Sequence, residues 1–273
     1  MGLNHNKYII FDIETVPLST EELMKKQLLE YLLDKQTKNW YMSPLLSKIV
    51  AVGIKHPDIE PEIFMAKSEK GIEGEKEIIM QYWKILENRD IEVIVTYNGY
   101  RFDIPYMNIK SMIYGIKPSR IIENISNIDR IVNKRTSGSI IHLDCFQIFS
   151  GSFDSSSFSW LSLYSVAKAI DVNIPDTPSY GSEVYEYYKK GDLTSIERHN
   201  KEDLIVLEDV YKKITPYIES YIGLSETEYP TEKQYNFLNR NILKLSTEEN
   251  EKLEKKELTK NEASNIIESI MKS

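Results

Sequence analysis

The sequence predicts an α/β fold in which a mixed five-stranded sheet is flanked by helices, followed by a small C-terminal helical appendage. Short runs rich in β-branched and aromatic residues alternate with segments of helical periodicity over the first part of the chain. The end of the chain is rich in Lys and Glu and has no strand-like run. With 273 residues, 41% hydrophobic and 28% charged, the composition is that of a globular protein. We therefore expect one α/β domain over residues 1–215, and a linker with a helical module over residues 216–273.

The expected strands are short runs bounded by turn residues. They are residues 7–13, 48–55, 62–66, 92–97 and 141–149. Pro17 and Leu18 are expected to break the first strand. The segment after residue 114 is expected to be irregular up to the last strand.

The expected helices follow from periodicity and from capping boxes, in which Ser or Thr precedes Glu or Gln by three residues. In the first domain they are residues 20–37, 73–88, 103–114, 160–171, 180–190 and 195–214. Ser19 with Glu22 and Thr194 with Glu197 are the capping boxes there. The Ser-rich segment 151–159 is expected to be a mobile loop.

In the module, capping boxes are expected at Thr231/Gln234, Ser246/Glu249 and Thr259/Glu262. Leu258, Ala263, Ile266, Ile267 and Ile270 recur there at helical spacing.

Composition excludes several classes of protein. The apolar runs are far shorter than the roughly 20 residues of a membrane span, and the first residues lack the pattern of a secretory signal. We expect a cytoplasmic protein with no membrane partner. The single cysteine, Cys145, rules out an internal disulfide and a thiolate zinc site, and we expect it to be a buried small hydrophobe.

The net charge of −8 argues against a nucleic-acid partner, because such proteins usually carry a basic excess. A site built of carboxylates would produce the same number.

Asp12 and Glu14 form the first group of candidate site residues. Alternation along a strand places both carboxylates on one face, where they repel unless a cation lies between them. Oxygen ligands of this kind suit Mg²⁺ or Mn²⁺. The alternative is a strand end with two solvated acids.

Two later groups also carry acids. Asp103 follows a strand and a glycine turn and opens a helix, where simple N-capping is the alternative. His199 and Asp203 are four residues apart on a predicted helix and share a face. The alternative for this pair is a solvated helix surface.

Taken in chain order, the three groups resemble the DEDD superfamily of 3′–5′ exonucleases, which have a ribonuclease-H-like fold. The middle motif, Asn98 to Asp103, is most similar to the exonuclease domains of family B DNA polymerases and their stand-alone relatives. The segments Ser43–Ala51 and His142–Asp144 also resemble that stand-alone group. The resemblance covers residues 7 to about 215.

One departure concerns the late helix. The Tyr subclass has Tyr-x-x-x-Asp there, and the His subclass has a spacing one residue longer. This chain has His199 at the Tyr-subclass spacing. The His-Asn-x-x-Asp pattern resembles a bacterial and archaeal ribonuclease-H-like group.

The resemblance implies a metal-dependent 3′–5′ exonuclease that acts on single-stranded DNA and releases nucleoside 5′-monophosphates. Two divalent ions, Mg²⁺ or Mn²⁺, would be held by Asp12, Glu14, Asp103 and Asp203. His199 would accept a proton from the attacking water, or would only orient it. An RNA-directed or structure-specific nuclease and a non-catalytic nucleic-acid-binding module are the alternatives.

The resemblance also implies substrate contacts. The backbone of Ile13 to Thr15 would meet the terminal nucleotide, and Asn98 and Phe102 would shape the cleft. Core packing is the alternative for Phe102.

Two further substrate contacts follow from charge. Lys134 and Arg135 lie in a basic stretch and suggest a phosphate clamp, with a solvated loop as the alternative. Asp144 is a candidate of another kind, which would not bind the metal itself but would support the residues that do.

The C-terminal module has a weaker resemblance, through Thr231–Gln234, Leu258–Thr259 and Glu262–Ser264, to a helical module at the ends of nucleic-acid-associated proteins. It would aid substrate binding or contact a replication or repair protein. If the four acids hold two divalent ions, the acidic excess is largely offset, and substrate binding should be weak without metal.

Overall fold

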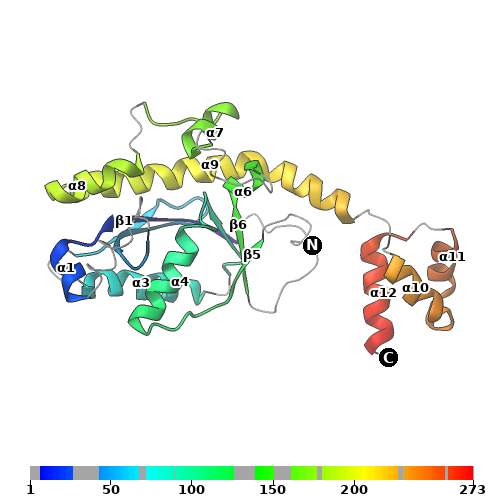
Figure 1. Cartoon of the computed structure of the whole chain (residues 1–273). Helices are drawn as coiled ribbons and strands as arrows, with labels where there is room; N and C mark the ends of the chain where they lie inside the picture. The colour runs from blue at the N-terminus through cyan, green and yellow to red at the C-terminus, as the bar shows by residue number, and fades with distance from the viewer. Residues whose placement is uncertain are drawn as a thin grey trace. The chain divides into compact units, whose positions relative to one another are not determined.

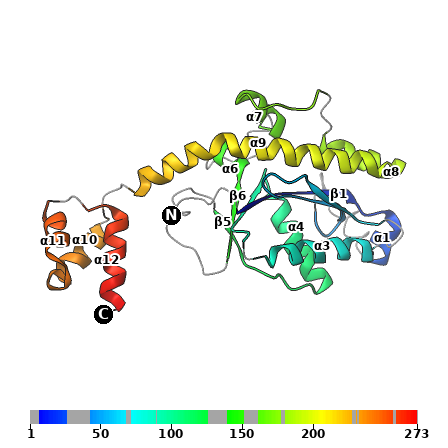
Figure 2. The ribbon, with the colours of Figure 1, turned by 180° about the vertical axis from the view of Figure 1, so that it is seen from behind.

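A mixed sheet lies between two layers of helices in the larger part of the molecule (Figures 1 and 2). The computed structural model describes residues 7–26, 43–67, 72–88, 90–125, 139–150, 161–176, 180–226, 230, 232–255 and 258–272. Contacts divide the chain near residue 214 into two compact units. The larger unit carries the sheet, and the smaller unit holds the C-terminal helices.

The sheet has six strands, which confirms the α/β class and adds one strand to the expected five. Across the sheet their order is β3 (Glu62–Met65), β2 (Ser47–Lys55), β1 (Tyr8–Pro17), β4 (Val93–Thr96), β6 (Ile140–Asp144) and β5 (Ile122–Ile125). β1 pairs antiparallel with β2 and parallel with β4. β5 lies in the segment expected to be irregular and is a four-residue edge strand. Its sequence alone does not predict a strand, and the strand forms through pairing with β6.

β1 divides its side chains between the two faces of the sheet. Ile9, Phe11 and Ile13 are buried in the main core, together with residues of α3 (Ile72–Leu86) and α4 (Asp103–Tyr114). The alternate residues face the opposite layer, where α9 (Leu193–Glu226) runs (Figure 1). β1 also continues to Pro17, beyond the expected end, because Val16 is buried in a second apolar cluster.

The expected strand 141–149 was wrong in its second half. β6 ends at Asp144, and α6 (Cys145–Ser150) begins at the next residue. The Asp144 carboxylate accepts a hydrogen bond from the backbone N–H of Phe146 at 3.0 Å, which is how an N-cap residue starts a helix. Cys145 is fully buried, as expected, although it lies in a helix rather than a strand.

The helices that cover the sheet differ from expectation mainly at their ends. α1 (Thr20–Lys25) has the expected capping box at Ser19. After α6 the chain forms α7 (Leu163–Ala169), α8 (Val184–Lys190), which follows a 3₁₀ turn at Gly181–Glu183, and α9. Residues 27–42 and 151–160, where a helix continuation and a mobile loop were expected, lie outside the described residues.

α9 begins two residues before its expected start and continues past residue 214. The Asp192 carboxylate accepts a hydrogen bond from the backbone N–H of Ser195 at 3.1 Å, so Asp192 caps the helix instead of Thr194. Pro216 lies inside the helix, more than three turns beyond Asp203. Among the described residues, none of the helices is both long and apolar enough to cross a membrane.

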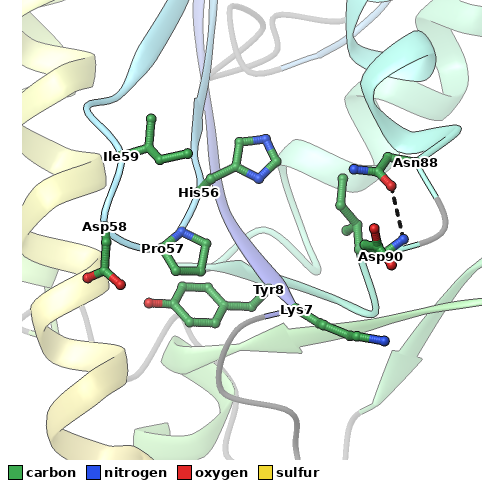
Figure 3. A pocket seen from close by; sticks show the side chains of 9 residues that line it. Lys7, Tyr8, His56, Pro57, Asp58, Ile59, Asn88 and Asp90 are labelled. Atoms are coloured by element: carbon green, nitrogen blue, oxygen red, sulfur yellow. Dashed lines mark hydrogen bonds between the residues drawn. The ribbon is translucent and has the colours of Figure 1, made fainter.

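A cavity of about 340 Å³ opens at the start of β1 (Figure 3). Tyr8 and the turn after β2 form one side, and the residues that follow α3 form the other. Its lining includes Lys7, Tyr8, His56, Asp58, Asn88 and Asp90. The cavity contains none of the predicted site residues.

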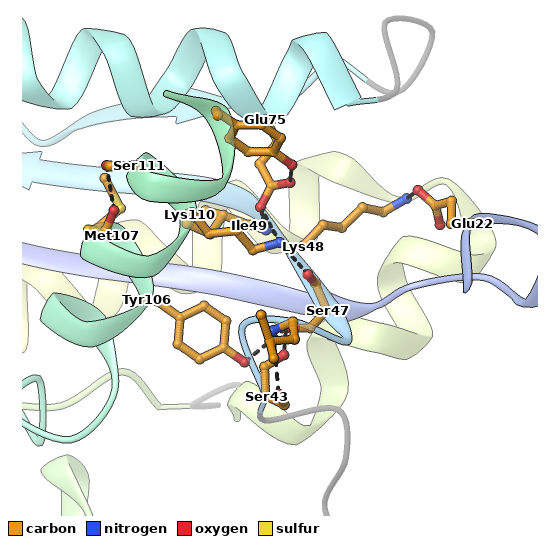
Figure 4. A network of polar contacts seen from close by, with 12 residues as sticks. Glu22, Ser43, Ser47, Lys48, Ile49, Glu75, Tyr106, Met107, Lys110 and Ser111 are labelled. Atoms are coloured by element: carbon orange, nitrogen blue, oxygen red, sulfur yellow. Dashed lines mark hydrogen bonds and ion pairs between the residues drawn. The ribbon is translucent and has the colours of Figure 1, made fainter. Parts of the chain in front are cut away.

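A buried ion pair ties the start of β2 to the helices beneath it (Figure 4). Lys110 Nζ lies 2.9 Å from a Glu75 carboxylate oxygen and donates to the carbonyl of Ser47 at 2.5 Å. Glu75 also accepts hydrogen bonds from the backbone N–H of Ile49 and from the hydroxyl of Tyr114. Burial lowers the pKa of Lys110. Because Lys110, Glu75 and Ser47 are all buried, this network fixes the segment that enters β2.

The smaller unit has its own apolar cluster. Its helices are α10 (Glu232–Arg240), α11 (Thr247–Glu254) and α12 (Lys260–Lys272), with a 3₁₀ turn at Ile242–Lys244. The cluster consists of Leu238, Leu253, Leu258, Ala263, Ile266 and Ile270, with Ile267 packed against it. The capping boxes expected at Ser246 and Thr259 are present, while Thr231 lies outside the described residues.

Candidate active site

The predicted acids come together from three elements of the larger unit. Asp12 and Glu14 are on β1, Asp103 is the first residue of α4, and Asp203 is on α9. Burial, followed by the Coulomb interaction with each of the other three carboxylates, raises the pKa of Asp12. Residues up to 191 positions apart in the sequence therefore share one electrostatic environment.

Asp12 is fixed by the helix that crosses above it. The side-chain amide of Asn200 donates to Asp12 Oδ2 at 2.7 Å. In the β1–β2 ladder Asp12 pairs with Gly53, and a Cβ on that glycine would lie 2.0 Å from Asn200 Oδ1 and 2.7 Å from Leu204 Cδ1. The absence of a side chain at Gly53 is therefore what lets α9 approach the sheet closely enough to reach Asp12.

Asp103 reaches the strand from the opposite layer. Its Oδ1 accepts a hydrogen bond from the backbone N–H of Ile13 at 3.0 Å, and the preceding residue, Phe102, makes no side-chain capping bond. Asp103 is 3% exposed. The capping alternative alone does not account for this residue, because its carboxylate accepts a hydrogen bond from β1 in addition to one from the backbone of Asp103 itself.

His199 lies between two of the acids and is buried. Its Nε2 is 3.4 Å from Glu14 Oε1, and its Nδ1 is 3.7 Å from Asp203 Oδ1. These contacts place Glu14 on the same face of β1 as Asp12, as strand alternation predicts. They also exclude the solvated-surface alternative for His199 and Asp203.

Burial and mutual repulsion make the carboxylates hard to ionise. Burial is the main cause that raises the pKa of Asp103 to about 7, with the nearby Asp144 adding to it. Burial, followed by the Asp203 charge, raises the pKa of Glu14 well above its ordinary value. Burial also raises the pKa of Asp203, although His199 and a hydrogen bond from Tyr164 oppose the shift. An added cation would relieve this cost in all of them.

The donor set suits a hard divalent cation, since all four acids offer oxygen ligands. Within the described residues, no group of three or more His, Cys, Asp or Glu side chains stands in a closed ligating arrangement. The fit of the four acids to a divalent cation thus rests on their charge and donor type.

The turn after β4 is braced from behind by Asp144. One carboxylate oxygen accepts from the backbone N–H of Asn98 at 2.7 Å, and the other accepts from that of Tyr100 at 3.1 Å. Asn98 has a φ of 64°, a conformation that asparagine tolerates better than most residues. The carboxylate thus holds the turn that leads to Asp103.

The neighbouring His142 is neutral and structural. Its Nε2 lies 2.8 Å from Thr96 Oγ1, and burial lowers its pKa to about 3. The His142–Asp144 segment therefore supports the site through the strand and turn, without a histidine that carries charge.

The predicted substrate contacts are only partly described. Phe102 is partly buried against the main core, with its ring centroid 4.5 Å from that of Tyr106. Thr15 lies just after a bulge in the β1–β2 ladder, and the Ile13 N–H is occupied by Asp103. Lys134 and Arg135 lie outside the described residues, so the phosphate clamp stays a prediction.

Sequence reasoning did not assign roles to Asn200, Tyr164 or Gly53. Asn200 precedes Asp203 by three residues and therefore shares its helix face, which is a signal that the sequence contains. Tyr164 donates from α7 to Asp203, and Gly53 provides clearance under α9. Both roles depend on tertiary packing, for which no local pattern exists.

A family model described as a "predicted 3′–5′ exonuclease related to the exonuclease domain of PolB" matches residues 39–255. The chain belongs to this PolB-related exonuclease family. The matched range contains Asp103, His199 and Asp203, while Asp12 and Glu14 precede it. The resemblance to the exonuclease domains of family B polymerases is thereby confirmed.

Similar proteins agree with membership of the PolB-related family. The chain is 24% identical over 187 residues to a DNA polymerase of Thermococcus gorgonarius, covering 66% of this chain and 24% of that protein. It is 25% identical over 149 residues to a DNA polymerase of Pyrococcus glycovorans, covering 53% and 19%. The chain thus spans about a quarter or less of the length of these relatives.

The fold has a counterpart among solved structures. The family B DNA polymerase of Pyrobaculum calidifontis matches 77% of this chain and 24% of that chain, with a TM-score of 0.53 and 19% identity. This likeness supports the ribonuclease-H-like fold.

Proposed function

We propose that this chain is a metal-dependent 3′–5′ exonuclease that hydrolyses phosphodiester bonds at the 3′ ends of single-stranded DNA and releases nucleoside 5′-monophosphates. The observation that carries the proposal is the convergence of four carboxylates, two of which lie beside a buried histidine. In a family of PolB-related exonucleases, this arrangement supplies both the ligands and the base that phosphodiester hydrolysis needs.

Asp12, Glu14, Asp103 and Asp203 would hold two divalent cations, Mg²⁺ or Mn²⁺. When bound, the cations lower the pKa of a water molecule and stabilise charge on the phosphate and the leaving oxygen. Asn200 keeps the Asp12 carboxylate in place, and the Ile13 N–H does the same for Asp103.

His199 accepts the proton that the attacking water loses. Glu14 lies near one ring nitrogen and Asp203 near the other, so the imidazole is oriented on both sides. If His199 only orients the water, its replacement by alanine should cost much less activity than replacement of Asp203.

The substrate strand would reach the acids across the end of β1. We infer that the backbone from Ile13 to Thr15 contacts the terminal nucleotide, and that Asn98 and Phe102 border it. Lys134 and Arg135 would bind phosphates further along the strand, because basic side chains supply most of the affinity for a nucleic-acid backbone. The C-terminal helices would contact the substrate or a replication or repair protein.

The test is a degradation assay with a 5′-labelled single-stranded DNA oligonucleotide in Mg²⁺ or Mn²⁺. We expect a ladder of shortened products and nucleoside 5′-monophosphates, abolished in Asp203→Asn. The matched control is Asp209→Asn, which removes an exposed acid from the same helix and should leave the rate unchanged.

Three further substrates separate the alternatives. Faster degradation of RNA, or cleavage of a circular single strand, would replace the proposal with an RNA-directed or structure-specific nuclease. Binding of DNA without shortening of any substrate in either metal would leave a non-catalytic module.

A further inference from the structure

Tyr164 brings a hydroxyl from α7 into the acid cluster. Its side chain is 8% exposed, and its hydroxyl donates to Asp203 Oδ1 at 2.5 Å. An ordinary tyrosine hydroxyl carries its proton at neutral pH, so Tyr164 is the donor in this contact and the carboxylate is the acceptor.

The contact selects one oxygen of the Asp203 carboxylate. His199 Nδ1 is also nearest to Oδ1, at 3.7 Å. The hydrogen bond from Tyr164 restricts rotation of the carboxylate, and it leaves Oδ2 as the oxygen that a cation can take without displacing the hydroxyl.

The Tyr164 ring is held independently of Asp203. The hydroxyl of Tyr97, just after β4, donates to the carbonyl of Leu161 at 2.7 Å, and Ser162 caps α7 through the N–H of Ser165. The ring of Tyr180 meets that of Tyr164 edge-on, with centroids 6.3 Å apart. A hydroxyl mounted this firmly can fix a neighbouring group at little cost in side-chain entropy.

We propose that Tyr164 is a positioning residue that orients the Asp203 carboxylate for a divalent cation. The role deepens the proposed function, because it rests on Asp203 being a metal ligand. Replacement of partners that orient metal ligands typically costs about 10- to 100-fold in metal affinity or activity.

The test measures Mn²⁺ binding to the full chain without nucleic acid, by calorimetry and by electron paramagnetic resonance. In Tyr164→Phe, which keeps the ring and removes the donor, we expect the Mn²⁺ dissociation constant to rise about tenfold. The matched control is Tyr180→Phe, which removes the hydroxyl from the neighbouring ring. This variant keeps the Tyr164–Asp203 hydrogen bond and should bind Mn²⁺ as the wild type does. Unchanged Mn²⁺ affinity in Tyr164→Phe overturns the proposal.

A second background shows whether the hydroxyl acts through Asp203. The double variant Asp203→Asn, Tyr164→Phe should bind Mn²⁺ less than twofold more weakly than Asp203→Asn alone. A tenfold loss of affinity between these two variants would overturn the proposal. Thermal unfolding in EDTA checks that each variant folds. If Tyr164→Phe unfolds, Tyr164→Gln and Tyr164→Leu, which differ in the ability to donate, replace it with the same expected difference.

Activity separates this inference from the proposed function. If the wild-type chain binds Mn²⁺ but degrades no substrate, the proposed exonuclease activity is refuted. The role of Tyr164 in Mn²⁺ binding is still tested by the binding measurements alone. If degradation occurs, Tyr164→Phe should raise the Mn²⁺ concentration for half-maximal rate and leave the KM for the oligonucleotide unchanged.

Discussion

The Asp103 carboxylate accepts a hydrogen bond, but its negative charge is unfavourable because the group is buried. Its carboxylate accepts from the Ile13 N–H, yet burial raises its pKa to about 7. The folded pKa exceeds the ordinary value of 3.8, so the protonated form favours the folded state. That stabilisation is complete below pH 3.8 and is lost as the pH rises through 7.

We therefore expect metal-free Asp103→Asn to be more stable than the wild type at pH 8, by about 1–3 kcal/mol, because the amide removes a buried charge and can still accept from Ile13. Thermal unfolding in EDTA at pH 5 and pH 8 measures this. The wild-type Tm should fall more steeply with pH than that of the variant. Parallel pH profiles would show that Asp103 ionises as freely as a surface acid.

Asn200 presents a different case, a neutral side chain that orients a charged one. Asn200→Ala removes the bond to Asp12 Oδ2, so we expect a loss of about 10- to 100-fold in the cleavage rate. The neighbouring surface variant Lys201→Ala should keep the wild-type rate in the same labelled-oligonucleotide assay. A rate within twofold of wild type for Asn200→Ala would contradict the role.

At the scale of elements, the packing of α9 on the sheet decides whether the site forms. In Gly53→Ala the new Cβ would overlap Asn200 and Leu204, so the helix must move away from β1. We expect about 1–3 kcal/mol of destabilisation and a disproportionate loss of activity.

Gly115→Ala is the matched control for Gly53→Ala. It introduces strain of roughly 1–2 kcal/mol at the C-terminal cap of α4, at a residue with a φ of 65° and open space around it. Comparison of unfolding free energies and cleavage rates separates general stability from site geometry. Equal losses of activity per kcal/mol in both variants would argue against the packing role of Gly53.

The elements also show why some structure was predictable and some was not. β1 and β2 have long apolar runs, and the capping box at Ser19 is a local signal, so both could be found from sequence alone. β5 and the switch from β6 to α6 could not, because edge pairing and the Asp144 cap arise only in the folded sheet. In the site, alternation predicted Asp12 and Glu14, whereas Tyr164 reaches Asp203 through packing across 39 positions.

At the scale of the whole molecule, each of the two units of the chain has apolar clusters of its own. Leu253→Ala removes a buried side chain from the cluster of the smaller unit, so we expect about 2–5 kcal/mol of destabilisation confined to α10–α12. Hydrogen exchange should show faster exchange in these helices and unchanged protection in the sheet. Loss of protection in β1 and β4 would show that the two units unfold as one.

Net charge is also a property of the whole chain. At −8 the protein repels a polyanion, and bound divalent cations would offset part of that charge. We expect the Kd for a single-stranded oligonucleotide, protected from cleavage by a 3′-terminal phosphorothioate linkage, to be at least tenfold higher in EDTA than in Mn²⁺. Fluorescence anisotropy at constant ionic strength measures both, and equal values would mean that binding does not depend on the metal.

β1 places one set of alternate side chains in the core and the other set in the acid cluster beside α9. Insertion of a single residue before Phe11 would exchange the two sets, turning carboxylates toward α3 and α4 and aromatic or aliphatic side chains toward α9. A mutational history of this strand would therefore contain substitutions but no single-residue insertions or deletions. Any engineered change of its length must come in pairs of residues, because folding and chemistry depend on the same register.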